Sequence, residues 1–200
     1  MLRKDCIPEN LAGLLEIVPS LECLSRFYLA GGTSLALRYG HRFSVDLDFF
    51  TDKPFETNHI LTELSELQPE LIGQDSNTLT LLIKGVKLDV LSHRYPLLRH
   101  PETIDSITLA SVPDVCAMKV NAVTRRGTKK DFFDLSCLMN IHSLREMIDF
   151  YLRKYPNVDT FTAVRSLGYF DDAEEDPDPL KAVENWENVK SKISEALRNL

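Results

Sequence analysis

The sequence predicts an α+β chain, in which a mixed β-sheet flanked by helices spans residues 1–112 and a helical region spans residues 113–200. Three observations support this prediction. Short apolar runs of strand length alternate with helix-like segments in the first part. Longer amphipathic segments with helical periodicity make up the second part. Neither an internal repeat nor a long linker interrupts the chain.

The elements of the first part follow from apolar patterns and from stop signals. Residues 8–26, rich in Leu, Ile and Glu, predict one or two helices, interrupted at Pro19, and "FYLAG" predicts a short strand. "GTSLALRYG" predicts a helix that begins near Thr33 or Ser34 and ends at Gly40. "VDLDFF" predicts the next strand, and "ETNHILTELSEL" predicts a helix on the surface.

The remaining elements change in character after Pro113. Before it, "NTLTLLIKGVKLDVLSH" predicts a hairpin around Lys84 and Gly85, and "TIDSITLAS" predicts one further strand. After it, "PDVCAMKVNAVTRR", "KKDFFDLSCLMN" and "SLREMIDFYLRKY" predict three helices. "DDAEEDPDP" predicts a solvated loop, because six of its nine residues are acidic. "KAVENWENVKSKISEALRNL" predicts a last amphipathic helix.

Composition and charge exclude several classes of protein. The net charge of -7 argues against bulk attraction to nucleic acid, although a local basic patch is compatible with it. The four cysteines form no CxxC pair, which predicts free thiols in a reducing compartment. No apolar run approaches the roughly 20 residues of a membrane span, and the first residues lack the apolar stretch of a signal peptide. We therefore expect a cytoplasmic protein with no membrane partner.

Two aspartates lie one residue apart in the apolar run "VDLDFF". The alternation of a strand places Asp46 and Asp48 on one face, with Leu47 and Phe49 on the other. Mg²⁺ prefers oxygen ligands and usually takes one or two carboxylates together with phosphate oxygens. The pair therefore predicts either a metal site or the solvated face of an edge strand.

A third acid, Asp89, lies in another apolar run, "VKLDVLS". A carboxylate on a neighbouring strand could bind a second metal and take the proton of an attacking hydroxyl. The alternative is a simple ion pair with Lys84 or Lys87 of the hairpin.

The turn Gly31-Gly32-Thr33-Ser34 precedes the first acids. Glycines let the backbone approach a phosphate, and a helix that begins here would direct free N–H groups at an anion. The hydroxyls of Thr33 and Ser34 could add donors. An ordinary strand-to-helix turn would have the same sequence.

A basic cluster follows in "MKVNAVTRRGTKKDFFDL", where five basic residues fall between positions 119 and 130. Lys119 and Arg126 are seven residues apart and therefore share one face of a helix. Such a cluster can bind a triphosphate or an RNA backbone. Asp131 and Asp134 follow three residues apart, so a charged surface with internal pairs such as Lys130 with Asp134 is the alternative.

Taken together, "GGTSLALRYGHRFSVDLDFF", "VKLDVLS" and "MKVNAVTRRGTKKDFFDL" resemble the AbiEii/AbiGii family of nucleotidyltransferase toxins, which are distant members of the polymerase-beta-like nucleotidyltransferase superfamily. The resemblance covers roughly residues 27–140. It implies a nucleotidyltransferase-like mixed β-sheet flanked by helices, followed by a C-terminal helical bundle. Residues 113–200 would pack on the core formed by residues 1–112 and complete the nucleotide cleft.

The resemblance also implies roles for individual residues. Arg42 and Ser44 lie at the HRxS positions of the family motif, to which no chemistry is assigned. Asp89 is placed by its strand context. Asp134 matches the later motif without an assigned role. The implied metal ligands are Asp46, Asp48 and Asp89. The implied catalytic residues are Asp46, Asp48, Asp89, Lys119 and Asp131, and the implied nucleotide-binding residues are Gly31, Gly32, Thr33, Ser34, Lys119, Arg126 and Lys130.

The expected activity is the transfer of a nucleoside monophosphate from a nucleoside triphosphate to a hydroxyl of tRNA or of a protein, with Mg²⁺ or Mn²⁺ as cofactor. The resemblance further implies the toxin of a type IV toxin–antitoxin or abortive-infection system, opposed by a separately encoded antitoxin. The alternative is a catalytically silent nucleotide-binding or partner-binding module of the same fold. A DxD glycosyltransferase is disfavoured, because no Rossmann-like alternation of strands and helices precedes the DxD.

Overall fold

The computed structural model describes residues 1–200 and divides them into two compact units. The first, which we call the sheet unit, contains Met1–Arg38, Ser44–Pro96 and Pro101–Ala110. The second, the helical unit, contains Tyr39–Phe43, Leu97–His100 and Ser111–Leu200. The chain therefore crosses finally from one unit to the other between Ala110 and Ser111.

The sheet unit is built on one mixed sheet of seven strands in the order β3-β4-β5-β2-β1-β7-β6. β2 runs parallel to β5 and antiparallel to β1, and β1 runs parallel to β7. This architecture confirms the predicted α+β fold with a mixed sheet. The strands are β1 (Tyr28–Leu29), β2 (Asp46–Thr51), β3 (Glu70–Gln74), β4 (Thr78–Ile83), β5 (Val86–Ser92), β6 (Glu102–Ile104) and β7 (Ile107–Leu109).

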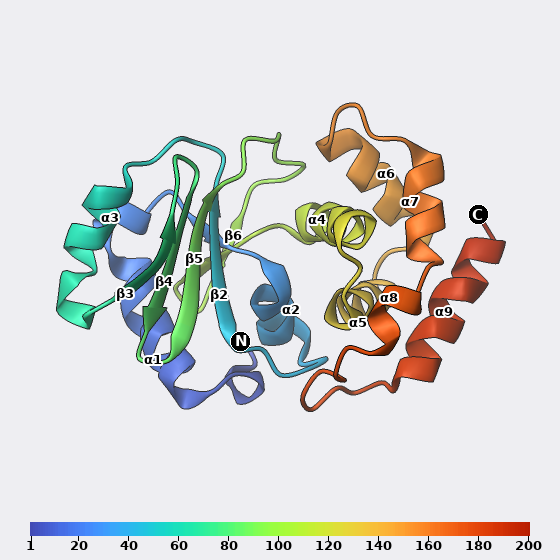
Figure 1. Ribbon diagram of the computed structural model, residues 1–200, viewed down its shortest axis with the longest axis horizontal. Helices are drawn as coiled ribbons and strands as arrows, with labels where there is room; N and C mark the ends of the chain where they lie inside the picture. Colours follow the sequence, from blue (N-terminus) through green and yellow to red (C-terminus); the bar gives the residue numbers. More distant parts are fainter. The chain divides into compact units, whose positions relative to one another are not determined.

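Helices cover the apolar face of this sheet. Leu47 and Phe49 of β2 are buried on that face, as the alternation of the strand predicted. α1 (Glu9–Ile17) and α3 (Thr57–Glu63) contribute Leu14 and Ile60 to the same core (Figure 1). α2 (Gly31–Tyr39) follows β1 directly. The opposite face of β4, β5 and β2 keeps the partly exposed side chains of these strands.

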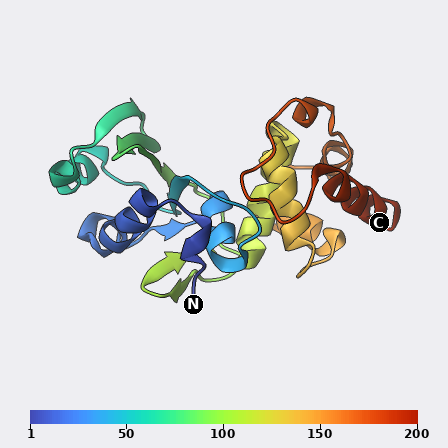
Figure 2. The same cartoon turned by 90° about the horizontal axis from the view of Figure 1, so that it is seen from below.

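Two strand predictions were incomplete. β3 was not predicted, and its burial pattern explains this, because four of its five residues are exposed and show no alternation. The segment predicted as one strand after Glu102 is a hairpin of β6 and β7, which turns at Asp105 and Ser106 with positive φ. The backbone N–H of Leu2 donates to the carboxylate of Asp105 at 2.6 Å, so the N-terminus lies beside this hairpin (Figure 2).

The helical unit consists of six helices that pack on one another (Figure 1). α4 contacts α5, α6 and α7, and α5 contacts α9. The Ser111 side chain caps α4 by accepting from the Asp114 N–H, and Ser143 and Glu146 form a capping box at α6. The helices are α4 (Val112–Arg125), α5 (Lys129–Leu138), α6 (Leu144–Lys154), α7 (Thr160–Leu167), α8 (Asp171–Glu174) and α9 (Trp186–Arg198).

The acidic segment after Phe170 is more ordered than the sequence predicted. Its first four residues form α8, because Ala173 is buried and Glu174 accepts hydrogen bonds from Trp186 and Lys190. α7 was not predicted, and α9 begins five residues later than expected, after Lys181 adopts a positive φ.

Two predictions from composition can be compared with the structure. All four cysteines are free thiols, as expected, and burial raises the pKa of Cys116 to about 12. None of the helices combines the length and the apolar character that a membrane span requires.

Candidate active site

The open face of the sheet unit carries a small grid of polar side chains. The parallel register pairs Asp46 with Lys87 and Asp48 with Asp89. The antiparallel register pairs Asp89 with Thr80 of β4. In-register neighbours in a sheet point to the same face, so all five residues lie together. The prediction that Asp46 and Asp48 share one face is confirmed.

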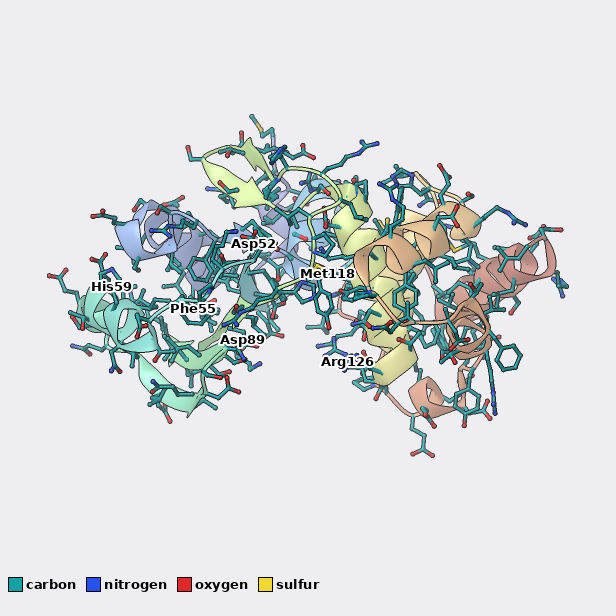
Figure 3. The ribbon with its side chains drawn as sticks, turned by 90° about the horizontal axis from the view of Figure 1, so that it is seen from above. Asp52, Phe55, His59, Asp89, Met118 and Arg126 are labelled. Carbon is teal, nitrogen blue, oxygen red and sulfur yellow. The ribbon has the colours of Figure 1, made fainter.

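The burial of β2 separates the two kinds of side chain on this strand. Asp46 and Asp48 are half-buried, whereas Leu47 and Phe49 between and beside them are buried. A carboxylate inside an apolar strand therefore keeps access to solvent, which removes most of the cost of burying a charge. Figure 3 labels Asp89 on the neighbouring strand β5, where it is also half-buried.

Asp89 has a partner on each of its oxygens. The Thr80 hydroxyl donates to Oδ1 at 2.7 Å, and the Lys87 ammonium donates to Oδ2 at 2.5 Å. The sequence offered two readings of Asp89, as a third acid of a site or as the partner of a lysine. The structure shows the ion pair with Lys87 and also places Asp89 beside Asp48.

Lys87 also belongs to this site. The sequence indicated it only as one of two lysines that could pair with Asp89. The hydrogen bond to Asp89 raises the pKa of Lys87, and the charges of Asp89, Asp48 and Asp46 act in the same direction against the effect of burial. The signal was available in "VKLDVLS", because residues at positions i and i+2 of a strand share a face.

The glycine turn lies directly against this grid. Gly31 begins α2 with φ of +65°, and a Cβ built on it would lie 2.4 Å from Oδ2 of Asp48. Only glycine leaves room for the Asp48 carboxylate and adopts this backbone conformation without strain. The N–H groups of the first turn of a helix have no partner within the helix. The turn therefore combines a helix N-terminus, which favours an anion, with a carboxylate, which favours a cation.

The hydroxyls of this turn bond to other groups of the protein. Thr33 bonds the Ser44 hydroxyl at 2.8 Å and donates to the Asp46 backbone oxygen, and the Ser34 hydroxyl donates to the Gly31 carbonyl at 2.9 Å. Both Thr33 and Ser34 are buried. The Thr33 hydroxyl therefore holds the turn onto β2, with Ser44 as its partner, and the Ser34 hydroxyl closes the turn on itself. The phosphate-binding role of both residues stays a prediction.

A second cluster of charges lies inside the helical unit, around Asp134 of α5. Its carboxylate accepts from His41 Nε2 at 2.6 Å and from Arg42 Nε and Nη2 at 2.7 and 3.0 Å. The Lys119 ammonium lies 2.7 Å from its other oxygen. Burial opposes the charge of Asp134, but Lys119, Arg42 and His41 outweigh it and hold the pKa of Asp134 well below its usual range.

Asp131 continues this network one turn earlier on α5. It accepts from Lys119 at 2.9 Å, from Arg126 Nε at 3.0 Å and from the Thr128 hydroxyl at 2.6 Å. Burial opposes the charge of Asp131, but these three donors outweigh it and lower the pKa of Asp131 to about 2. For Lys119 burial also opposes the charge, and Asp134 and Asp131 raise its pKa above the ordinary value.

These contacts bring together most of the later motif. Lys119 and Arg126 both donate to Asp131, a pairing that their spacing did not predict, and Arg126 follows the last residue of α4. Arg126, labelled in Figure 3 at the end of α4, keeps 58% of its side chain exposed, and Lys130 is exposed. Asp131 is fully buried, so its surroundings give no support to the expected catalytic role. The suggested pair of Lys130 with Asp134 is not formed, because Asp134 is occupied by other cations.

No group of three or more histidine, cysteine, aspartate or glutamate side chains is arranged to hold a metal ion. The donor chemistry nevertheless fits a divalent cation at Asp46 and Asp48. Two half-buried carboxylates on one face supply the oxygen ligands that Mg²⁺ takes in addition to phosphate oxygens and water. Asp89 is adjacent but is bound to Lys87.

Comparison with known proteins shows the family of the whole chain. The family model of the nucleotidyl transferase AbiEii toxin, type IV TA system, matches residues 15–199. The uncharacterized protein aq_aa25 of Aquifex aeolicus is 42% identical over 200 residues, covering 92% of this chain and 95% of its own. This chain belongs to the AbiEii family. It is therefore a nucleotidyltransferase, as the resemblance implied.

Solved structures similar to this AbiEii protein confirm the fold. A Helicobacter pylori protein described as a candidate nucleotidyltransferase matches with a TM-score of 0.62 and 15% identity, over 94% of this chain and 90% of its own. JHP933 from Helicobacter pylori matches with a TM-score of 0.60 and 16% identity, over 94% and 88%. The antibiotic-resistance factor ANT(2'')-Ia matches with a TM-score of 0.52 and 15% identity, over 70% and 84%.

Proposed function

We propose that this nucleotidyltransferase uses Mg²⁺ or Mn²⁺ to transfer a nucleoside monophosphate from a nucleoside triphosphate to a hydroxyl of tRNA or of a protein. One observation carries the proposal. Asp46 and Asp48 lie side by side on the open face of β2, and the Asp48 carboxylate lies against Gly31 at the N-terminus of α2. Oxygen ligands for a cation and N–H groups for a phosphate therefore meet at one place.

In this proposal each polar residue of the sheet unit has a separate role in binding or in proton transfer. Asp46 and Asp48 hold the cation, which when bound neutralises phosphate charge and orients the triphosphate. The N–H groups of Gly31 and Gly32 face a phosphate oxygen, because the missing side chains allow close approach. The acceptor hydroxyl forms a bond to the α-phosphorus, the bond from the α-phosphorus to the bridging oxygen breaks, and pyrophosphate leaves. Asp89 is the carboxylate to which we assign the hydroxyl proton.

For the helical unit by itself, we propose that Lys119, Arg126 and Lys130 bind phosphate groups. An ammonium group has three N–H donors, and Lys119 uses two of them on Asp131 and Asp134, which leaves one for a phosphate oxygen. The side chains of Arg126 and Lys130 are exposed and can therefore contact a triphosphate or an RNA backbone. Asp131 acts as a positioning residue, because it holds both Lys119 and Arg126.

The family description supports a biological role as the toxin of a type IV toxin–antitoxin system, and we propose a separately encoded antitoxin as its partner. Such a toxin would act in the cytoplasm, where nucleoside triphosphates and tRNA are present. A small gene directly beside that of the enzyme would be the first evidence for the antitoxin.

The test is label transfer. The protein is incubated with each α-³²P-labelled nucleoside triphosphate, Mg²⁺ and either total RNA or total protein, and the labelled species is identified by electrophoresis. We expect label on one class of acceptor, and none with Asp46→Ala or Asp48→Asn, which should fold normally. A Lys84→Ala variant, changed at an exposed turn residue, is the matched control and should retain transfer. Absence of transfer from all four nucleotides would favour the silent binding module.

A further inference from the structure

Lys87 is the one cation among the residues of β4, β5 and β2 that share the open face of the sheet. Its register partner across the sheet is Asp46, and its neighbour two positions along β5 is Asp89. Adjacent strands lie about 4.8 Å apart, and alternate residues of a strand lie about 6.6 Å apart. Three carboxylates therefore surround the base of one flexible lysine side chain, and all three act on its charge.

The Lys87 ammonium forms an ion pair with one of these carboxylates, that of Asp89. It lies 2.5 Å from Oδ2 of Asp89, while the Thr80 hydroxyl occupies Oδ1. Each oxygen of Asp89 thus has a hydrogen-bond donor already. A divalent cation bound to Oδ2 would lie close to the ammonium, and the repulsion between the two positive charges favours departure of the ammonium.

We propose that Lys87 is an internal counter-ion that competes with the divalent metal for Asp89. This inference rests on the proposed function, since it takes Asp46 and Asp48 as the metal pair. Metal binding displaces the Lys87 ammonium from Asp89. The side chain can move, because 49% of it is exposed and lysine is a flexible chain with a strongly hydrated head group.

Two consequences follow from electrostatics. The metal-free protein is stabilised by Lys87, because without it Asp46, Asp48 and Asp89 would repel one another on one face. The affinity for metal alone is lowered by Lys87, because binding must break an existing ion pair and must bring two cations close together.

The experiment measures Mn²⁺ binding to the whole protein by isothermal titration calorimetry. We expect Lys87→Gln to bind Mn²⁺ roughly fivefold more tightly than the unchanged protein, which corresponds to about 1 kcal/mol. Lys87→Arg keeps the charge and should bind no more tightly than the unchanged protein. Lys84→Gln removes the same charge three residues away, at the exposed hairpin turn, and should show no such increase.

Thermal melting gives a second readout that does not depend on activity. The Tm of the metal-free Lys87→Gln protein should fall, and added Mn²⁺ should raise it by more than it raises the Tm of the unchanged protein. Circular dichroism verifies that the variant is folded.

The failure of this inference can be distinguished from that of the proposed function. If Asp48→Asn loses Mn²⁺ binding while Lys87→Gln binds Mn²⁺ no more tightly than the unchanged protein, the metal site stands and the role of Lys87 is refuted. If Asp46→Asn and Asp48→Asn both bind Mn²⁺ as well as the unchanged protein, the metal lies elsewhere and both proposals are refuted.

Discussion

In the helical unit, Asp131 and Asp134 are fully buried, and each accepts hydrogen bonds from at least three donors. In the sheet unit, Asp46 and Asp48 are only half-buried, on an open sheet face. The same side chain thus serves two purposes. Where protein cations already surround the carboxylate, it holds helices together, and where it stays open to solvent, it remains available to a ligand.

The largest effect should come from breaking the buried network. Asp134→Ala leaves Arg42 and Lys119 buried without that carboxylate, and removal of one partner of a buried ion pair costs about 3–5 kcal/mol. Urea unfolding followed by the fluorescence of Trp186, the single tryptophan, measures this loss in the helical unit. Asp46→Ala is the matched control and should change stability by less than about 0.5 kcal/mol. Equal losses for the two variants would refute the contrast between the units.

The pH dependence should locate a second effect in the helical unit. The folded pKa of Asp131 is about 2, below its unfolded value of 3.8, so its contribution is complete above about pH 5 and is lost as the pH falls through 2. The shift corresponds to about 2 kcal/mol. Urea unfolding at pH 7, 5 and 3, again followed through Trp186, measures it.

Asp131→Asn provides the control for this pH dependence. The variant should be less stable than the unchanged protein at pH 7, and its stability should fall less between pH 5 and pH 3. A loss that is equally steep in both proteins would assign the acid sensitivity to other carboxylates.

The glycine turn should show a smaller effect that combines stability with activity. Gly31→Ala places a Cβ against the Asp48 carboxylate and forces alanine into a positive φ, at a cost of about 1–2 kcal/mol. Transfer should also fall, because Asp48 must move. Gly13→Ala in α1 is the control, since its Cβ would meet nothing within 4 Å, and it should be neutral or stabilising by about 0.5–1 kcal/mol. Normal activity in Gly31→Ala would disconnect the turn from the chemistry.

The smallest change in stability is expected at Lys130. Its side chain is exposed, so Lys130→Ala should alter the free energy of unfolding by less than about 0.5 kcal/mol. If it contacts an RNA acceptor, binding should weaken and the slope of affinity against salt concentration should decrease by about one. Filter binding at several salt concentrations measures both. An unchanged slope would show that Lys130 makes no contact with the RNA backbone.

Much of the fold could be predicted from local patterns. The alternation in "VDLDFF" and "VKLDVLS" predicted β2 and β5 together with the face of each aspartate. Proline at position 113 and the basic residues at the end of the segment predicted α4. β3 and α8 could not be predicted, because β3 is an exposed edge strand without alternation, and α8 depends on contacts of Glu174 with Trp186 and Lys190.

The site was predictable in its residue types but not in its pairings. The sequence by itself determined that Asp46 and Asp48 share a face, because this follows from the periodicity of a single strand. Only the tertiary structure decided that Asp131 and Asp134 are buried among cations, that the Thr33 and Ser34 hydroxyls face inward, and that Lys87 occupies Asp89. Pairing depends on the register between strands and on helix packing, and these bring together residues that are distant in the chain and whose partners no local pattern specifies.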